Sequence, residues 1–82
     1  MPALNIVSWN ILHGGGSRCE SILEKIHSSG ADIVTLQEFR HGKHGDVLLE
    51  GLKSQGLTSV CAPPTSSARE NTLLIALSLI HI

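Results

Sequence analysis

Two residues with oxygen-bearing side chains, Asn10 and Glu38, stand at the ends of two strand-like runs of the sequence, residues 4–11 and 32–38. One side chain is an amide and the other a carboxylate. Hard cations such as Mg²⁺ prefer oxygen ligands of this kind, usually with waters and substrate phosphate completing the shell. Asn10 and Glu38 are therefore the candidate catalytic and metal-binding residues, provided that the fold brings them together.

An amphipathic helix separates the two strands and decides where their ends lie. Apolar residues recur at i, i+3, i+4 and i+7, namely Cys19, Ile22, Leu23 and Ile26. Residues 17–20 (SRCE) have the form of a capping box, and Gly30 stands where a left-handed C-cap belongs. A strand–helix–strand unit normally places its strands parallel in one sheet, and ligands of open α/β sheets bind at the carboxyl ends of such strands. The sequence thus predicts that Asn10 and Glu38 face one crevice.

The remainder of the chain predicts one small α/β domain with the order β-α-β-α-β-β. Asp46 is the expected N-cap of a second helix that ends at Gly56, and a short strand follows at residues 58–62. Residues 65–71 read as a loop, and an apolar strand begins at Thr72. The first strand has apolar residues on both sides, which is typical of strands covered on both faces.

Composition excludes several classes of protein. Six Lys and Arg residues against seven Asp and Glu residues, in 82, leave no basic stripe for nucleic acid or a membrane surface. The N-terminus lacks the pattern of a signal peptide, and no apolar run approaches the ~20 residues of a membrane span. Cys19 and Cys61 lack metal or redox spacing, so we expect two buried thiols and a cytoplasmic protein.

Three segments resemble the N-terminal part of the endonuclease/exonuclease/phosphatase superfamily. They are residues 6–12 (IVSWNIL), residues 31–38 (ADIVTLQE) and, more loosely, residues 71–76 (NTLLIA). This group contains pancreatic-type deoxyribonucleases, abasic-site endonucleases, and inositol-phosphate and sphingomyelin phosphodiesterases. The resemblance implies that residues 1–76 are the N-terminal portion of a four-layer α/β sandwich, incomplete here because the second sheet has no counterpart in the sequence.

The resemblance also implies roles for the two candidate residues. Glu38 matches the family's metal-binding glutamate, and Asn10 matches the asparagine beside that metal. The implied cofactor is Mg²⁺, with Mn²⁺ as the alternative, and the implied reaction is hydrolysis of phosphodiester bonds by an activated water, with DNA as the favoured phosphoester substrate. Later family residues, including an Asp–His pair, have no matching position. We therefore expect a full-length parent to be the enzyme, and the 82-residue chain to be inactive, with an exposed sheet face and poor solubility.

The last six residues, 77–82 (LSLIHI), resemble the translation of an adapter used in preparing sequencing libraries. They would then be read-through beyond a genuine protein that reaches about Ala76. The alternative is an ordinary final strand.

Other functions compete with the phosphoesterase. A non-catalytic interaction module of the same fold would keep the strands without the chemistry. Residues 13–16 (HGGG) resemble the oxyanion loop of esterases, but the G-x-S-x-G elbow that such enzymes need is lacking. His41 and His44 supply only half of a zinc site and read as solvated loop residues. Arg40 has a guanidinium suited to phosphate, with exposed surface as its default. Substrate identity and oligomeric state stay open.

Overall fold

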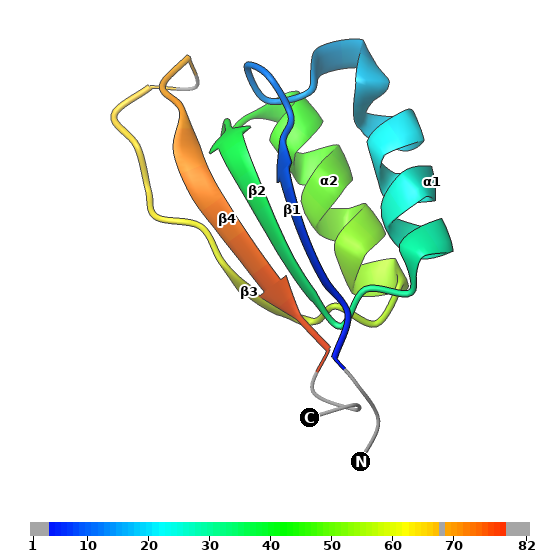
Figure 1. Cartoon of the computed structure of the whole chain (residues 1–82). Coiled ribbons are helices and arrows are strands. Elements are labelled where there is room, and N and C mark those ends of the chain that lie inside the picture. The colour runs from blue at the N-terminus through cyan, green and yellow to red at the C-terminus, as the bar shows by residue number, and fades with distance from the viewer. Residues whose placement is uncertain (1–3, 68, 79–82) are drawn as a thin grey trace.

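The computed structural model describes residues 4–67 and 69–78. Its elements follow the predicted order of strands and helices (Figure 1). In chain order they are β1 Ile6–Asn10, a 3₁₀ turn η1 Gly16–Arg18, α1 Cys19–Ser29, β2 Ile33–Phe39, α2 Lys43–Ser54, β3 Ser59–Cys61 and β4 Thr72–Leu77.

The four strands form one mixed sheet in the order β1-β2-β4-β3. β1 pairs with β2 in parallel, and Asn10 lies opposite Gln37 in their register. This confirms that the two strands end at the same edge of the sheet. β4 is antiparallel to both β2 and β3, so β4 begins at the edge where β1 and β2 end.

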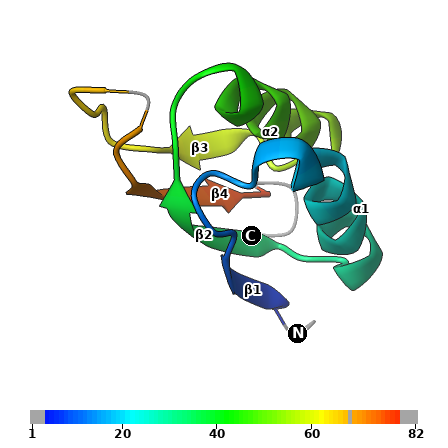
Figure 2. The same cartoon turned by 90° about the horizontal axis from the view of Figure 1, so that it is seen from above.

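Both helices cover the same face of the sheet (Figures 1 and 2). The inward-facing residues of the two central strands are fully buried, because they alternate with outward-facing neighbours along each strand. The strand members of this core are Val34, Leu36, Phe39, Leu74 and Ala76, and the helix members are Cys19, Ile22, Ile26, Leu48 and Leu52. The core therefore lies between the sheet and the helix pair, and it fixes the edge that carries Asn10 and Glu38.

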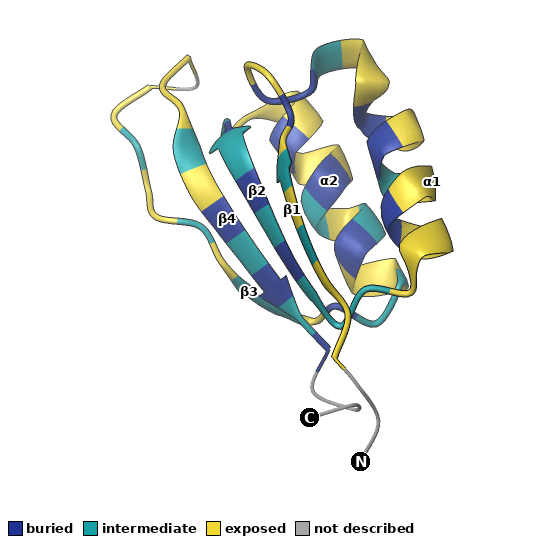
Figure 3. Cartoon of the chain, in the orientation of Figure 1, coloured by how far each residue is buried: buried dark blue, intermediate teal, exposed yellow. Residues whose placement is uncertain are grey.

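The opposite face of the sheet is uncovered within the described ranges (Figure 3). Ile6 is 63% exposed and Leu73 is 41% exposed, although both lie within strands. The prediction that β1 is covered on both faces is thus wrong for the part of the chain that the structure describes. The expectation of an exposed sheet face, which came from the family resemblance, agrees with this arrangement.

Two predicted helix starts are also wrong. Ser17 belongs to η1, and Arg18 rather than Ser17 takes the N-cap position of α1, with no side-chain hydrogen bond there. α2 begins at Lys43, and the Asp46 amide donates to the Gly42 carbonyl (2.8 Å) inside its first turn. The C-cap prediction is confirmed, since Gly30 has φ 66° and donates to the His27 carbonyl.

The two cysteines have different surroundings. Cys19 is buried in the core, and burial raises the pKa of its thiol despite the opposing charge of Arg18. Cys61 is exposed, which corrects the prediction of two buried thiols. The reason is its place on edge strand β3, where Val60 packs against the core and Cys61 alternates to the uncovered face.

Neither helix of the described ranges has the length and apolar character required to cross a bilayer. Of the six C-terminal residues assigned to adapter read-through, Leu77 ends β4, where it pairs with Ile33 and Ser59. The amide of Ser78 donates to the Asp32 carbonyl (2.9 Å). Residues 79–82 lie outside the described residues.

Candidate functional site

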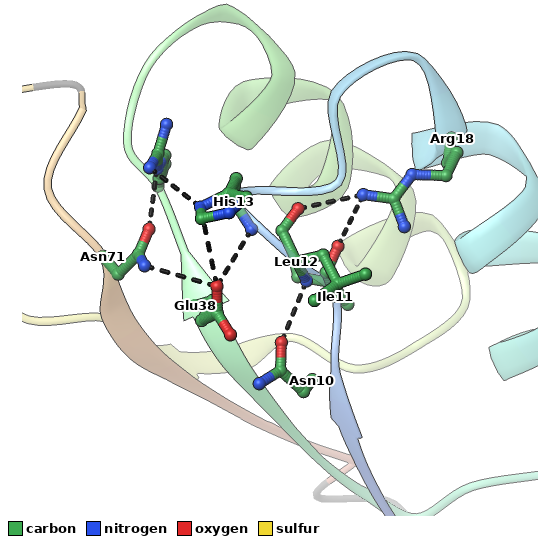
Figure 4. A network of polar contacts seen from close by, with 8 residues as sticks. Asn10, Ile11, Leu12, His13, Arg18, Glu38 and Asn71 are labelled. Carbon is green, nitrogen blue, oxygen red and sulfur yellow. Dashed lines mark hydrogen bonds and ion pairs between the residues drawn. The ribbon is translucent and has the colours of Figure 1, made fainter.

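The structure brings Asn10 and Glu38 together at the edge where β1 and β2 end (Figure 4). The Asn10 Oδ1 atom accepts a hydrogen bond from the Leu12 amide (3.0 Å). The amide nitrogen of the same side chain is therefore available to the Glu38 carboxylate, and hydrogen bonding from Asn10 is the largest cause that lowers the pKa of Glu38. The parallel pairing inferred from the sequence thus places the two candidate residues at the same edge of the sheet.

An irregularity at the end of β2 turns Glu38 toward this edge. The pairing of β2 with β4 shifts between Leu36 and Phe39, and Glu38 has φ 59°. Leu36 and Phe39 are both buried, although a regular strand would direct residues three apart to opposite faces. The β-bulge resolves this conflict because its extra residue can leave the ladder. Gln37 stays on the uncovered face and donates to the Ser8 hydroxyl (2.9 Å).

Backbone strain is concentrated at the site. Within the described ranges, the non-glycine residues with positive φ are Leu12 (57°), His13 (51°) and Glu38 (59°). Each left-handed residue of this kind costs about 1–2 kcal/mol. Leu12 and His13 lie in the loop after β1, and Glu38 lies near the end of β2. Strained backbone of this kind clusters at functional sites, where the surrounding structure holds it in place.

Two segments hold the Glu38 carboxylate, and their contacts converge on one oxygen. Oε1 accepts from the His13 backbone amide (3.3 Å) and from Asn71 Nδ2 (3.4 Å), and it lies 3.6 Å from His13 Nδ1 (Figure 4). His13 comes from the loop after β1, and Asn71 directly precedes β4. Because a carboxylate has about four acceptor positions, Oε2 keeps capacity for a further ligand.

Arg40 links the same two segments, because its guanidinium contacts both Asn71 and His13. Its Nε donates to Asn71 Oδ1 (2.6 Å), and its Nη2 lies 3.1 Å from His13 Nδ1. Since a guanidinium only donates, His13 Nδ1 is the acceptor in this contact and the ring proton belongs on Nε2. Arg40 is half-buried, which corrects the default of an exposed surface residue.

Arg18 fixes the loop after β1 in a similar way. Its Nη2 donates to the carbonyls of Ile11 (2.8 Å) and Leu12 (2.9 Å). Sequence reasoning missed the contributions of Arg18, His13 and Asn71. Their residue types alone gave no signal, because their contacts arise from the backbone geometry after β1 and before β4.

The electrostatics favour an ionised carboxylate. The pKa of Glu38 is lowered first by hydrogen bonding from Asn10, then by the His13 backbone amide, and the positive charge of Arg40 lowers it further. Partial desolvation opposes these contributions. Glu38 is therefore an ionised carboxylate across the neutral pH range.

The residues around Glu38 fit an open magnesium site better than a closed metal cage. A cleft of about 220 Å³ is lined by Gln37, Glu38, Asn71, Thr72 and Leu73. Among the described residues, no three His, Cys, Asp or Glu side chains form a metal-type group. Mg²⁺ is commonly held by one or two carboxylates with waters and substrate oxygens, so Glu38 with the remaining lone pair of Asn10 Oδ1 is an adequate protein contribution.

The histidines of the β2–α2 segment do not converge as zinc ligands. His41 Nε2 lies 2.7 Å from the Pro63 carbonyl, and its ring packs edge-on against Phe39. His44 is exposed on the first turn of α2. His41 is thus half-buried and engaged rather than solvated, which corrects part of the earlier expectation.

No protein-family model matches the chain, and neither does any curated protein or solved structure. What the site can do therefore follows from its own geometry.

Proposed function

We propose that this edge of the sheet is part of the metal site of a phosphoester hydrolase of the endonuclease/exonuclease/phosphatase type. We call the part formed by Asn10 and Glu38 the metal corner. Glu38 is the metal ligand, and Asn10 both orients its carboxylate and offers an oxygen to the same ion. The observation that supports this most directly is the meeting of Asn10 with an ionised Glu38 across two parallel strands. Phosphodiesters are the proposed substrates, with DNA favoured among them.

The residues of this chain would hold the metal ion and orient its carboxylate ligand. Glu38 would bind Mg²⁺ or Mn²⁺, while His13 and Asn71 keep its carboxylate in one orientation. The bound ion would supply positive charge to the phosphoryl and leaving oxygens. A lone carboxylate that serves as a metal ligand does not also activate a water. We therefore place turnover in a longer parent protein, and expect this chain to bind metal without hydrolysing substrate.

The uncovered sheet face supports the finer fold proposal, a four-layer sandwich. Strand alternation places no charged residue on this face of the described strands, and Ile6, Ile33 and Leu77 form one row across β1, β2 and β4. Such a face favours burial against another apolar layer, because large exposed apolar patches mark contact surfaces. We propose a second sheet in that position. The free thiols of Cys19 and Cys61 suit a reducing compartment, and we propose the cytoplasm.

Metal binding to the 82-residue chain tests the function. Paramagnetic Mn²⁺, added in small amounts, should broaden the backbone amide signals of His13, Glu38 and Asn71 in a nuclear magnetic resonance spectrum. Excess Mg²⁺ should restore them by competition. Glu38→Gln should remove the response, because an amide lacks the charge that holds the ion.

Glu70→Gln is the matched control. Glu70 is an exposed glutamate whose carboxylate is held by its own loop, through the Ser66 backbone amide (3.0 Å) and hydroxyl (2.8 Å). Its replacement should leave the broadening unchanged. Equal responses in the wild type and Glu38→Gln would contradict the metal corner and favour the non-catalytic interaction module. Phosphodiester hydrolysis by the chain alone would contradict our assignment of turnover to a longer protein.

A further inference from the structure

A second cavity lies on the other side of the His13–Arg40 contact. Its volume is about 190 Å³, and it opens between the loop after β1 and the first turn of α2. The nitrogen-bearing side chains in its lining are His13, Arg40, His41, Lys43 and His44, and the remaining lining residues are glycines.

The lining is cationic and rich in donors. No acidic residue contributes to it. Lys43 has no ion-pair partner within the part of the chain that the structure describes. Arg40 uses Nε and Nη2 toward Asn71 and His13, which leaves other guanidinium N–H groups uncommitted. Donors from three segments thus surround a space of a size that admits a tetrahedral oxyanion.

The glycines lack side chains that would fill the cavity. They also allow the loop after β1 and the start of α2 to lie close to Arg40. A side chain at Gly14 would collide with the Cβ of Arg40 at 2.9 Å, and one at Gly45 would collide with the Arg40 backbone. The loop after β1 and the start of α2 therefore approach Arg40 closely from two sides. Gly16 meets nothing within 4 Å, so the lining there is backbone beside open space.

We infer that this cavity binds a phosphate group, and specifically a second, non-reacting phosphate of the same substrate. The second half of the inference rests on the proposed function, because it requires a scissile phosphate at Glu38. His13 and Arg40 line this cavity and also contact the groups that hold Glu38, so the two sites share one wall. A nucleic-acid strand carries adjacent phosphates, whereas a simple phosphomonoester has only one.

Inorganic phosphate titrated into the full chain without divalent metal tests the cavity. Backbone amide shifts should saturate at His13, Gly14, Lys43 and Gly45, and should be absent at Thr72. Lys43→Gln should weaken binding about tenfold, the usual loss for one charge-assisted hydrogen bond. Lys53→Gln, at the other end of α2, is the matched control and should leave the affinity unchanged.

Two further measurements separate this inference from the metal corner. Glu38→Gln should remove the Mn²⁺ response while phosphate still binds. With Mg²⁺ present, a 5′-phosphorylated dinucleotide should bind more tightly than phosphate, and Lys43→Gln should cancel the advantage. Shifts confined to Glu38 and Asn71, equal weakening by the Lys43 and Lys53 variants, or an absence of saturable binding would overturn the cavity assignment. An equal affinity for the dinucleotide and phosphate would overturn the second-phosphate role.

Discussion

Neighbouring hydrogen-bond donors, rather than burial, set the charge of Glu38. Its side chain is 26% exposed, and Asn10, His13 and Asn71 all approach its carboxylate. The backbone of Glu38 is left-handed, and this conformation directs the carboxylate toward these donors. The hydrogen bonds to the carboxylate therefore offset the backbone strain. At the scale of single residues, the site is therefore an ionised carboxylate that polar neighbours hold in one orientation.

The lowered pKa of Glu38 predicts how stability depends on pH. A carboxylate whose pKa is lower in the folded than in the unfolded protein stabilises the fold fully above the unfolded value, about 4.3. That stabilisation is lost as the pH falls through the folded value. The unfolding free energy of the wild type should therefore drop below about pH 4.3, and Glu38→Gln should show a smaller drop. Urea denaturation at a series of pH values measures this.

Glu70→Gln provides the comparison within the same experiment. The pKa of Glu70 is also lowered, mainly by the Ser66 hydroxyl and then by its backbone amide. Glu70→Gln should also show a smaller acid-induced loss of unfolding free energy than the wild type, but it should leave metal binding intact. An acid-induced loss as large in Glu38→Gln as in the wild type would show that the contacts around Glu38 do not favour its ionised form.

At the scale of elements, two glycines of α2 lie close to neighbouring segments. Gly45 lies against Arg40, and Gly51 lies against Leu23 of α1. A side chain at Gly45 would meet the backbone carbonyl of Arg40, whereas one at Gly51 would meet only the flexible end of Leu23. Gly45 lies in the first turn of the helix, beside the inferred phosphate cavity. The start of α2 is therefore fixed against the end of β2 by backbone contact.

Alanine substitutions at these glycines should have different effects. Both replacements gain up to about 1 kcal/mol of helix propensity. Gly45→Ala should nevertheless destabilise the fold by about 2 kcal/mol, because the overpacked backbone has no room to move. Gly51→Ala should be near neutral, because Leu23 can change rotamer. Thermal and urea denaturation of the two variants measure this, and equal stabilities would contradict the close approach at Gly45.

The comparison of sequence and structure shows which elements were predictable. Strand–helix–strand order and the stripe on α1 sufficed to place Asn10 and Glu38 at one edge, because parallel pairing follows from the crossover. The contributions of His13 and Asn71 were not predictable. They depend on the bulge at Glu38 and on the antiparallel entry of β4, which arise from tertiary packing. The early start of α2 likewise does not depend on a capping side chain, because Gly42 takes the N-cap position.

At the scale of the whole molecule, residues 4–67 and 69–78 leave one sheet face covered by helices and the other uncovered. Leu73 and Leu74 are neighbours on β4, yet Leu73 is 41% exposed and Leu74 is fully buried. Because Ile6 and Leu73 are exposed on the uncovered face, this face should bind apolar dyes and promote self-association.

Lysine substitutions at these neighbours test that arrangement. Leu73→Lys should reduce fluorescence of the dye 8-anilinonaphthalene-1-sulfonate and self-association, with little loss of stability, because the new charge stays in water. Leu74→Lys should unfold the protein, because it buries an unpaired charge. Sedimentation velocity and circular dichroism measure the two effects. Similar destabilisation by both variants would show that the face around Leu73 is not free.

The antiparallel direction of β4 determines how the residues around Glu38 can change in related sequences. Asn71 reaches Glu38 at the end of a surface connection between β3 and β4, not through a second crossover. Lengthening a connection of this kind adds only about 0.6 kcal/mol of closure entropy for each doubling. This contributor to the site can therefore be exchanged or extended in related sequences while the hydrophobic layer beneath stays the same, which would allow ligand preference to diverge without rebuilding the scaffold.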